Sequence, residues 1–170
     1  MLALDAAQKS QFPNALADVA SAANPPFSLG VDDFSHLKSS RLLMYDALLQ
    51  QAAGNAAAAQ ADWQAAAQTL DDDIEGEGLF RAIALYKIGQ VQKAEAWFKD
   101  FAVVNGQRKT DSAVSIRLHA YDLAGIYAAM QGDDGAARED FQKALEIDQS
   151  YLYARQSMAW LEAGMFKDLK

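Results

Sequence analysis

Three glycines, Gly54, Gly89 and Gly132, stand between stretches of helical periodicity, and they limit the possible folds more than any other feature of the sequence. Glycine adopts without strain the left-handed backbone conformation that ends a helix. Two of the residues that follow these glycines, Asn55 and Asp133, are good caps for the start of a next helix. The chain is therefore predicted to form helix hairpins, each with a glycine at its turn.

Small and aromatic residues recur at fixed distances from the three glycines. A small residue stands seven positions before each glycine, and an alanine stands five positions after it. An aromatic residue follows nine positions after each glycine, and an alanine or a phenylalanine follows twelve positions after it. These gaps of three and four keep the residues on one helical face, where small side chains let helices approach and aromatic ones fill the space between hairpins. The residues are Ala47, Ala82 and Gly125 before the turns, and Ala59, Ala94, Ala137, Trp63, Phe98, Phe141, Ala66, Phe101 and Ala144 after them.

This arrangement resembles the tetratricopeptide repeat, which has a small residue in its first helix, glycine at the turn, and alanine, an aromatic residue and alanine in its second helix. In the register of that family a repeat domain takes up residues 39–170, with repeats at about 40–73, 75–108 and 118–151 and a capping helix at 151–163. The resemblance implies an all-α fold, a right-handed superhelix of antiparallel helix pairs with about three repeats and a C-terminal capping helix. A helix-pair solenoid of another family is the alternative.

Two regions do not follow the repeat pattern. Residues 1–38 are predicted to form a separate N-terminal region with two short helices, the second at 14–23, and then an irregular apolar segment at 27–37. Between the second and third repeats, the polar stretch 105–111 is predicted to be a loop, with the next helix beginning near Ser112.

Charge, cysteine content and the lengths of the apolar runs exclude several kinds of partner and of site. The net charge of −8 repels nucleic-acid phosphates and anionic lipid surfaces, so neither nucleic acid nor a membrane is expected as a partner. The absence of cysteine excludes disulfides and thiolate zinc sites. No apolar run approaches the roughly 20 residues that span a bilayer, and residues 1–9 lack the basic start and apolar core of a secretory signal. We expect a cytoplasmic protein, or a piece cut from a longer one.

Candidate catalytic and metal-binding residues are few. His36 and His119 have neither a second histidine nor a carboxylate at metal-ligand spacing, and no nucleophile or phosphate-loop motif is present. The acidic run 71–73 lacks the oxygen spacing of a helix-loop-helix calcium site. It fits the start of a helix, where carboxylates face the positive end of the helix dipole. We therefore predict that the protein is not an enzyme and has no catalytic residue, cofactor or metal.

The tetratricopeptide resemblance also implies a concave groove lined by the first helix of each repeat. The lysine and asparagine clamp with which some members hold a carboxyl terminus is absent, because Met44, Leu48, Leu79 and Ile83 stand at the matching positions. The groove is largely apolar, and such a surface should not stay empty in water. By position within the repeats, the partner-binding groove consists of Arg41, Met44, Leu48, Gln51, Leu79, Ile83, Tyr86, Lys87, His119, Asp122, Ile126 and Met130, with Tyr153, Gln156 and Trp160 from the last helix.

Three kinds of cover fit an apolar groove. The favoured one is the chain's own segment 27–37, the next is a hydrophobic partner peptide or helix, and the third is a second copy in a homodimer. The predicted function is accordingly that of a non-catalytic interaction scaffold, which binds a peptide or partner helix in an apolar concave groove.

A second resemblance gives an alternative function. The strings 78–81 and 120–125 are similar to the helical C-terminal part of certain large bacterial proteins, which carry β-sandwich domains of a carbohydrate-processing type ahead of their repeats. This resemblance implies a structural C-terminal appendage or dimerisation module of a larger bacterial enzyme, with any catalytic residues outside this chain.

Overall fold

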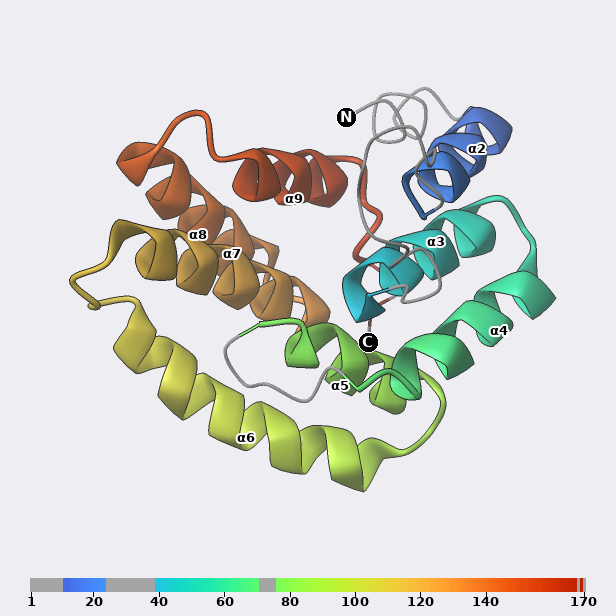
Figure 1. Cartoon of the computed structure of the whole chain (residues 1–170), viewed down its shortest axis with the longest axis horizontal. Helices are drawn as coiled ribbons and strands as arrows, with labels where there is room; N and C mark the ends of the chain where they lie inside the picture. The colour runs from blue at the N-terminus through green and yellow to red at the C-terminus, as the bar shows by residue number, and fades with distance from the viewer. Residues whose placement is uncertain (1–10, 24–38, 71–75, 168, 170) are drawn as a thin grey trace, which may run out of the picture.

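The regular secondary structure of the described residues is helical throughout, which confirms the all-α prediction. The computed structural model describes residues 11–23, 39–70, 76–167 and 169 (Figure 1). None of its helices has the length and apolar character needed to cross a bilayer. The helices are α2 (Phe12–Ala23), α3 (Ser40–Ala52), α4 (Ala56–Ala67), α5 (Gly78–Lys87), α6 (Val91–Arg108), α7 (Val114–Met130), α8 (Asp134–Ile147) and α9 (Leu152–Glu162).

Three helix hairpins follow one another along the chain. Helix α3 packs against α4, α5 against α6, and α7 against α8. The turns contain Gly54, Gly89 and Gly132, whose φ angles of 82°, 84° and 80° lie in the left-handed region. Only glycine adopts this conformation without steric cost. The predicted hairpin turns are therefore confirmed.

The recurrent small and aromatic residues lie in the core. Ala59, Ala94 and Ala137 are buried, and so are the aromatic side chains four positions after them. In the third hairpin the contact is closest between Gly125 on α7 and Phe141 on α8, since a Cβ atom at Gly125 would lie 2.3 Å from Cε1 of the phenylalanine. Because Gly125 has no side chain, the ring of Phe141 on α8 can pack directly against α7.

Two details of the helix boundaries differ from the sequence-based prediction. Asp133 caps α8 by accepting from the amide of Ala136 at 2.9 Å, as expected, but the side chain of Asn55 makes no cap bond to α4. The side-chain nitrogen Nδ2 of Asn55 instead donates to Gln50 Oε1 at 2.9 Å. The predicted loop from Asn105 is also wrong in its first part, because α6 continues to Arg108 and α7 begins at Val114.

Asn105 shows why α6 is longer than predicted. Its side chain is buried, and its amide nitrogen donates to the carbonyl oxygen of Ala120 on α7 at 2.9 Å. The polar residue that looked typical of a loop therefore joins two helices. Near the N-terminus, Pro13 lies in the first turn of α2, where proline is tolerated because its missing N–H has no partner in any case. The predicted first short helix, the segment 27–37 and the acidic run 71–73 lie outside the described residues.

The hairpins curve so that the last helix returns to the first hairpin. Helix α3 contacts α5, α5 contacts α7, and α7 contacts α9. Helix α9 also reaches α3, because the rings of Tyr45 and Trp160 lie 4.8 Å apart between centroids. Figure 1 shows α9 between the α7–α8 side and the α2–α3 side of the molecule. After α9, Gly164 turns the chain with a φ of 70°, and Phe166 and Leu169 are buried in the shared core.

Candidate functional site

Most of the predicted groove residues are buried and do not line an open groove in this structure. Helix α9, Phe166 and Leu169 share one apolar core cluster with the first helices of the hairpins. We call the faces of α3, α5 and α7 that belong to this cluster the inner surface. The buried residues are Arg41, Met44, Leu48, Leu79, Ile83, Asp122, Ile126, Met130 and Trp160, while Gln51, Tyr86, Lys87, His119 and Gln156 are half-buried and Tyr153 is exposed.

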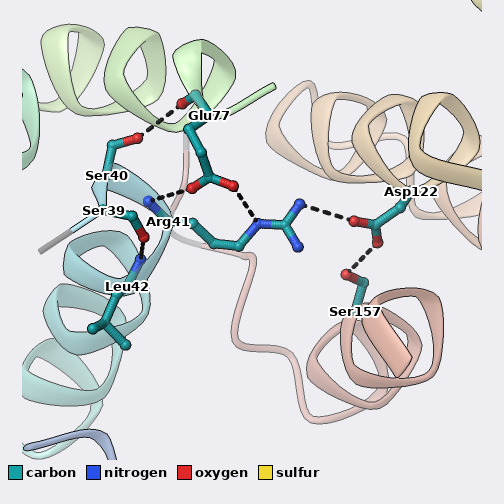
Figure 2. A network of polar contacts seen from close by, with 7 residues as sticks. All are labelled: Ser39, Ser40, Arg41, Leu42, Glu77, Asp122 and Ser157. Carbon is teal, nitrogen blue, oxygen red and sulfur yellow. Dashed lines mark hydrogen bonds and ion pairs between the residues drawn. The ribbon is translucent and has the colours of Figure 1, made fainter. Parts of the chain in front are cut away.

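A polar network at the start of α3 joins this helix to α5. Ser39 caps α3 by accepting from the amide of Leu42 at 3.3 Å, and Ser40 Oγ donates to the carbonyl oxygen of Glu77 at 2.8 Å. The backbone amide of Arg41 donates to Glu77 Oε2 at 3.3 Å. Figure 2 shows that these bonds fix the first turn of α3 beside the first turn of α5. The side chain of Arg41 therefore starts from a rigid position.

The guanidinium group of Arg41 reaches across the inner surface to α7. Its Nη2 lies 3.1 Å from Asp122 Oδ2, and its Nε lies 3.5 Å from Glu77 Oε1. The rings of Phe80 and Tyr153 lie over the guanidinium group, each with its centroid 4.4 Å from Cζ. Arg41 thus joins α3 to α5, α7 and α9 at one point. Attraction between a cation and an aromatic face stabilises such contacts most when water is excluded.

Asp122 connects the same point to α9 by a second bond. Its Oδ1 accepts from Ser157 Oγ at 2.7 Å, and both side chains have no exposed surface (Figure 2). Tyr45, whose ring packs on Trp160, also lies beside Ser157. We call Arg41, Tyr45, Glu77, Asp122 and Ser157 the inner polar cluster.

The charged and titratable groups here are held in one protonation state at neutral pH. Burial by itself lowers the pKa of Arg41. The electrostatic effects of Tyr45, Asp122 and Glu77 raise the pKa by more than burial lowers it, so the guanidinium stays charged. Burial raises the pKa of Tyr45 to about 12, although Arg41 opposes the shift, so the phenol stays protonated. Burial, followed by Arg41, lowers the pKa of His119 and favours the neutral imidazole. This arrangement is suited to holding or recognising polar groups, because none of these shifts brings a pKa towards neutral pH for proton transfer.

The inner polar cluster is expensive to bury. Among the described residues, five polar or charged side chains are buried, and three of them, Arg41, Asp122 and Ser157, belong to it. Arg41 Nη1 is buried without a hydrogen-bond partner among the described residues. Taking paired charges out of water costs several kcal/mol for each ion, and their attraction repays this cost only when the geometry is good. A cluster of this kind is therefore weak support for a purely stabilising role.

Sequence reasoning identified part of this cluster and missed the rest. Arg41 and Asp122 were among the predicted groove residues, whereas Tyr45, Glu77 and Ser157 were not. Ser157 carried a usable signal, since it stands four positions after Tyr153 and three before Trp160, on the same helical face. Glu77 carried a weaker one, because it directly precedes α5.

A cavity of about 220 Å³ lies between α6, α7 and α8, away from the inner polar cluster. Its lining includes Phe101, Tyr127 and Asn105, and the ion pair between Lys109 Nζ and Asp140 Oδ1 at 2.6 Å. The pairing already neutralises the one lysine there. The free oxygen Oδ1 of Asn105 has almost no accessible surface, so a bound molecule would not reach it.

Metal-binding groups and known relatives add no further assignment. Within residues 11–23, 39–70, 76–167 and 169, no group of three histidine or carboxylate side chains is placed to hold a metal ion, and His36 lies outside these ranges. Comparisons of the chain with protein-family models, with curated proteins and with solved structures found no match.

Proposed function

We propose that this protein is a non-catalytic interaction scaffold of the tetratricopeptide kind, which binds an amphipathic helix on its inner surface. The observation that carries the proposal is that this surface already holds a helix, α9, which lies between α7 and α3, the first helices of the third and first hairpins. The three hairpins share one register of small and aromatic residues, which is the register of the family. Stacked helix pairs of this kind build extended binding surfaces.

The chemistry of the inner surface favours a helix with a mostly apolar face. Met44, Leu79, Ile83 and Ile126 are buried there under the chain's own side chains. Burial of apolar area stabilises by about 25 cal/mol per Å², so any occupant that replaces these side chains must present apolar area of its own. Recognition of an apolar helical stripe by a groove is an established mode of peptide binding.

A displayed library of helical peptides tests this proposal. Peptides enriched on the full chain would carry a photoreactive group, and the cross-linked residues would be identified by mass spectrometry. Cross-links to α3, α5 and α7 are the expected result. A screen that enriches no peptide, or cross-links confined to α4, α6 and α8, would refute binding on the inner surface. Charged substitutions of Leu79 or Ile126 are unsuitable as variants here, because both side chains are fully buried and the chain would unfold.

A second candidate function is the structural appendage or dimerisation module of a larger bacterial enzyme. The observation that favours it is a group of exposed apolar side chains at the end of α8 and the start of α9. Ile147, Leu152 and Tyr153 are 36%, 46% and 45% exposed. Light scattering over a range of concentrations distinguishes the two candidates in part. Dimerisation through this corner predicts a mass that rises with concentration and that falls to the monomer value in the variant Leu152→Ser.

A further inference from the structure

We propose that α9 is an internal ligand of the inner surface, which a partner helix of the same chemistry displaces. The inference rests on the proposed function, because it names the kind of partner that the inner surface takes and the way in which access to it is controlled. The partner is a helix with an aromatic residue, a small hydroxyl residue four positions later, and a second aromatic residue three positions after that.

The inward face of α9 displays this pattern. Tyr153 lies over the guanidinium group of Arg41, Ser157 donates to Asp122 at 2.7 Å, and Trp160 packs on Tyr45. These three residues of α9 follow at spacings of four and three, so they form one stripe along the helix. Each of them contacts α3 or α7 through a different kind of interaction. The inner surface therefore recognises the identity as well as the spacing of the side chains on the helix.

The polar part of this contact favours reversible docking. When α9 leaves, Arg41 and Asp122 regain water, which offsets much of the free energy lost with their bonds to Tyr153 and Ser157. A helix that served only as a permanent cover would be held at lower cost by apolar side chains of similar size. While α9 is docked, Arg41 also retains a buried N–H group that has no partner among the described residues. The docked state is thus less favourable than its buried area alone implies.

Outside this stripe, α9 is attached to α8 and, through Leu161 and the residues that follow it, to the core. The helix has 11 residues, fewer than an isolated helix needs to be stable in water. Its ion pair with α8, between Arg138 and Glu162 at 3.1 Å, is exposed on both sides and contributes little. Ala154 is the side chain that it buries beside Leu118 and Ala144, and alanine contributes little apolar area. The apolar anchors are Trp160, which packs with Phe166, and the buried Leu161, so a competing helix must supply an aromatic residue at the first position and an apolar residue at the second.

Asp122 makes the inner surface reject helices that carry an acidic residue at the position of Ser157. It is fully buried and accepts a hydrogen bond from a hydroxyl group of α9. A carboxylate at the position of Ser157 would meet this buried carboxylate, and like charges in the interior repel strongly. A helix with aspartate or glutamate four positions after its first aromatic residue is therefore rejected.

A fluorescent peptide with the sequence of residues 151–169 tests the inference on the full chain. The variant Ser157→Ala loses a hydrogen bond to a charged acceptor, which opens α9 more often and leaves the binding surface intact. The peptide is expected to bind this variant about tenfold more tightly than the parent, because a loss of about 1.4 kcal/mol in docking raises the open fraction tenfold. The matched control is Ser115→Ala, on an exposed position of α7, which should bind the peptide as the parent does.

Hydrogen exchange gives a second readout on the same proteins. Amides of α9 should exchange faster in Ser157→Ala than in the parent, with those of α7 unchanged. If the variant does not fold, the parent decides the question: it must bind the unaltered peptide and must not bind a peptide with Trp160→Ala. The inference is overturned if no form of the chain binds the peptide and α9 is as protected as α7. Library peptides that still cross-link to α3, α5 and α7 would then leave the proposed function standing and reject only the role of α9.

Discussion

The close contact between Gly125 and Phe141 makes the third hairpin sensitive to a single methyl group. A Cβ atom at Gly125 would overlap the ring, with Cε1 at 2.3 Å, and Phe141 is fully buried. We expect Gly125→Ala to lower the free energy of unfolding by about 1–3 kcal/mol, the usual range for an overpacked core. Urea unfolding followed by circular dichroism measures the change.

Gly106 provides the control for this substitution. It lies within α6, and a Cβ atom added to it would have nothing within 4 Å. Alanine in a helix interior is more favourable than glycine by about 0.5–1 kcal/mol, so Gly106→Ala should stabilise the protein. If Gly125→Ala and Gly106→Ala had the same effect, the close helix approach in the third hairpin would be wrong.

Tyr45 gives the protein a dependence on alkaline pH. The side chain as a whole is half-buried, but its hydroxyl group lies in the interior, where burial raises the pKa from 10.0 to about 12. Since the folded-state pKa is the higher one, this contribution to stability is complete below pH 10 and is lost as pH rises towards 12. The loss is expected to reach about 1–3 kcal/mol. Unfolding measured between these pH values should show a smaller decline in Tyr45→Phe, and an unchanged decline would contradict the burial of the hydroxyl.

At the scale of helices, the two predicted caps differ in a way that mutation can detect. Asp133 accepts a hydrogen bond from the amide of Ala136, whereas the side chain of Asn55 makes none to α4. We expect Asp133→Ala to destabilise the protein by about 0.5–2 kcal/mol, as the loss of an N-cap generally does. Asn55→Ala should change the melting temperature little. Equal losses in the two variants would mean that both residues act as caps in solution.

The helices could be predicted from the sequence because their signals are local. A glycine at each turn and a small residue facing an aromatic one are decided within a hairpin, so Gly54, Gly89 and Gly132 marked the turns correctly. The end of α6 was missed because it depends on a contact with another helix. Asn105 and Gly106 are typical of loops, but the bond from Asn105 to the carbonyl oxygen of Ala120 exists only once α7 has packed.

For the whole molecule, the sequence identified the inner surface but not its cover. Residues such as Arg41, Asp122 and Trp160 were placed together by repeat register, and the structure brings them together. That α9 covers them could not be foreseen, because the return of α9 to α3 depends on small packing angles that add up over three hairpins. The partners Glu77 and Ser157 of the buried charges follow from that same closure.

Variants of the ion pair between Arg41 and Asp122 test whether the closed shape, in which α9 packs on α3 and α7, is held by charge or by packing. Arg41→Met leaves Asp122 buried and unpaired, and we expect a loss of about 3–5 kcal/mol in unfolding free energy. Adding Asp122→Leu should recover most of that loss, because a well-packed apolar pair often replaces a buried ion pair without net cost.

Urea unfolding of the parent, both single variants and the double variant closes this thermodynamic cycle. Recovery in the double variant, together with slower hydrogen exchange in α9, would mean that the charges do not stabilise the fold and instead let α9 open. A double variant as unstable as Arg41→Met would show that the ion pair is a net stabiliser. Burial of the pair would then not favour release of α9, because a contact that stabilises the closed shape resists opening.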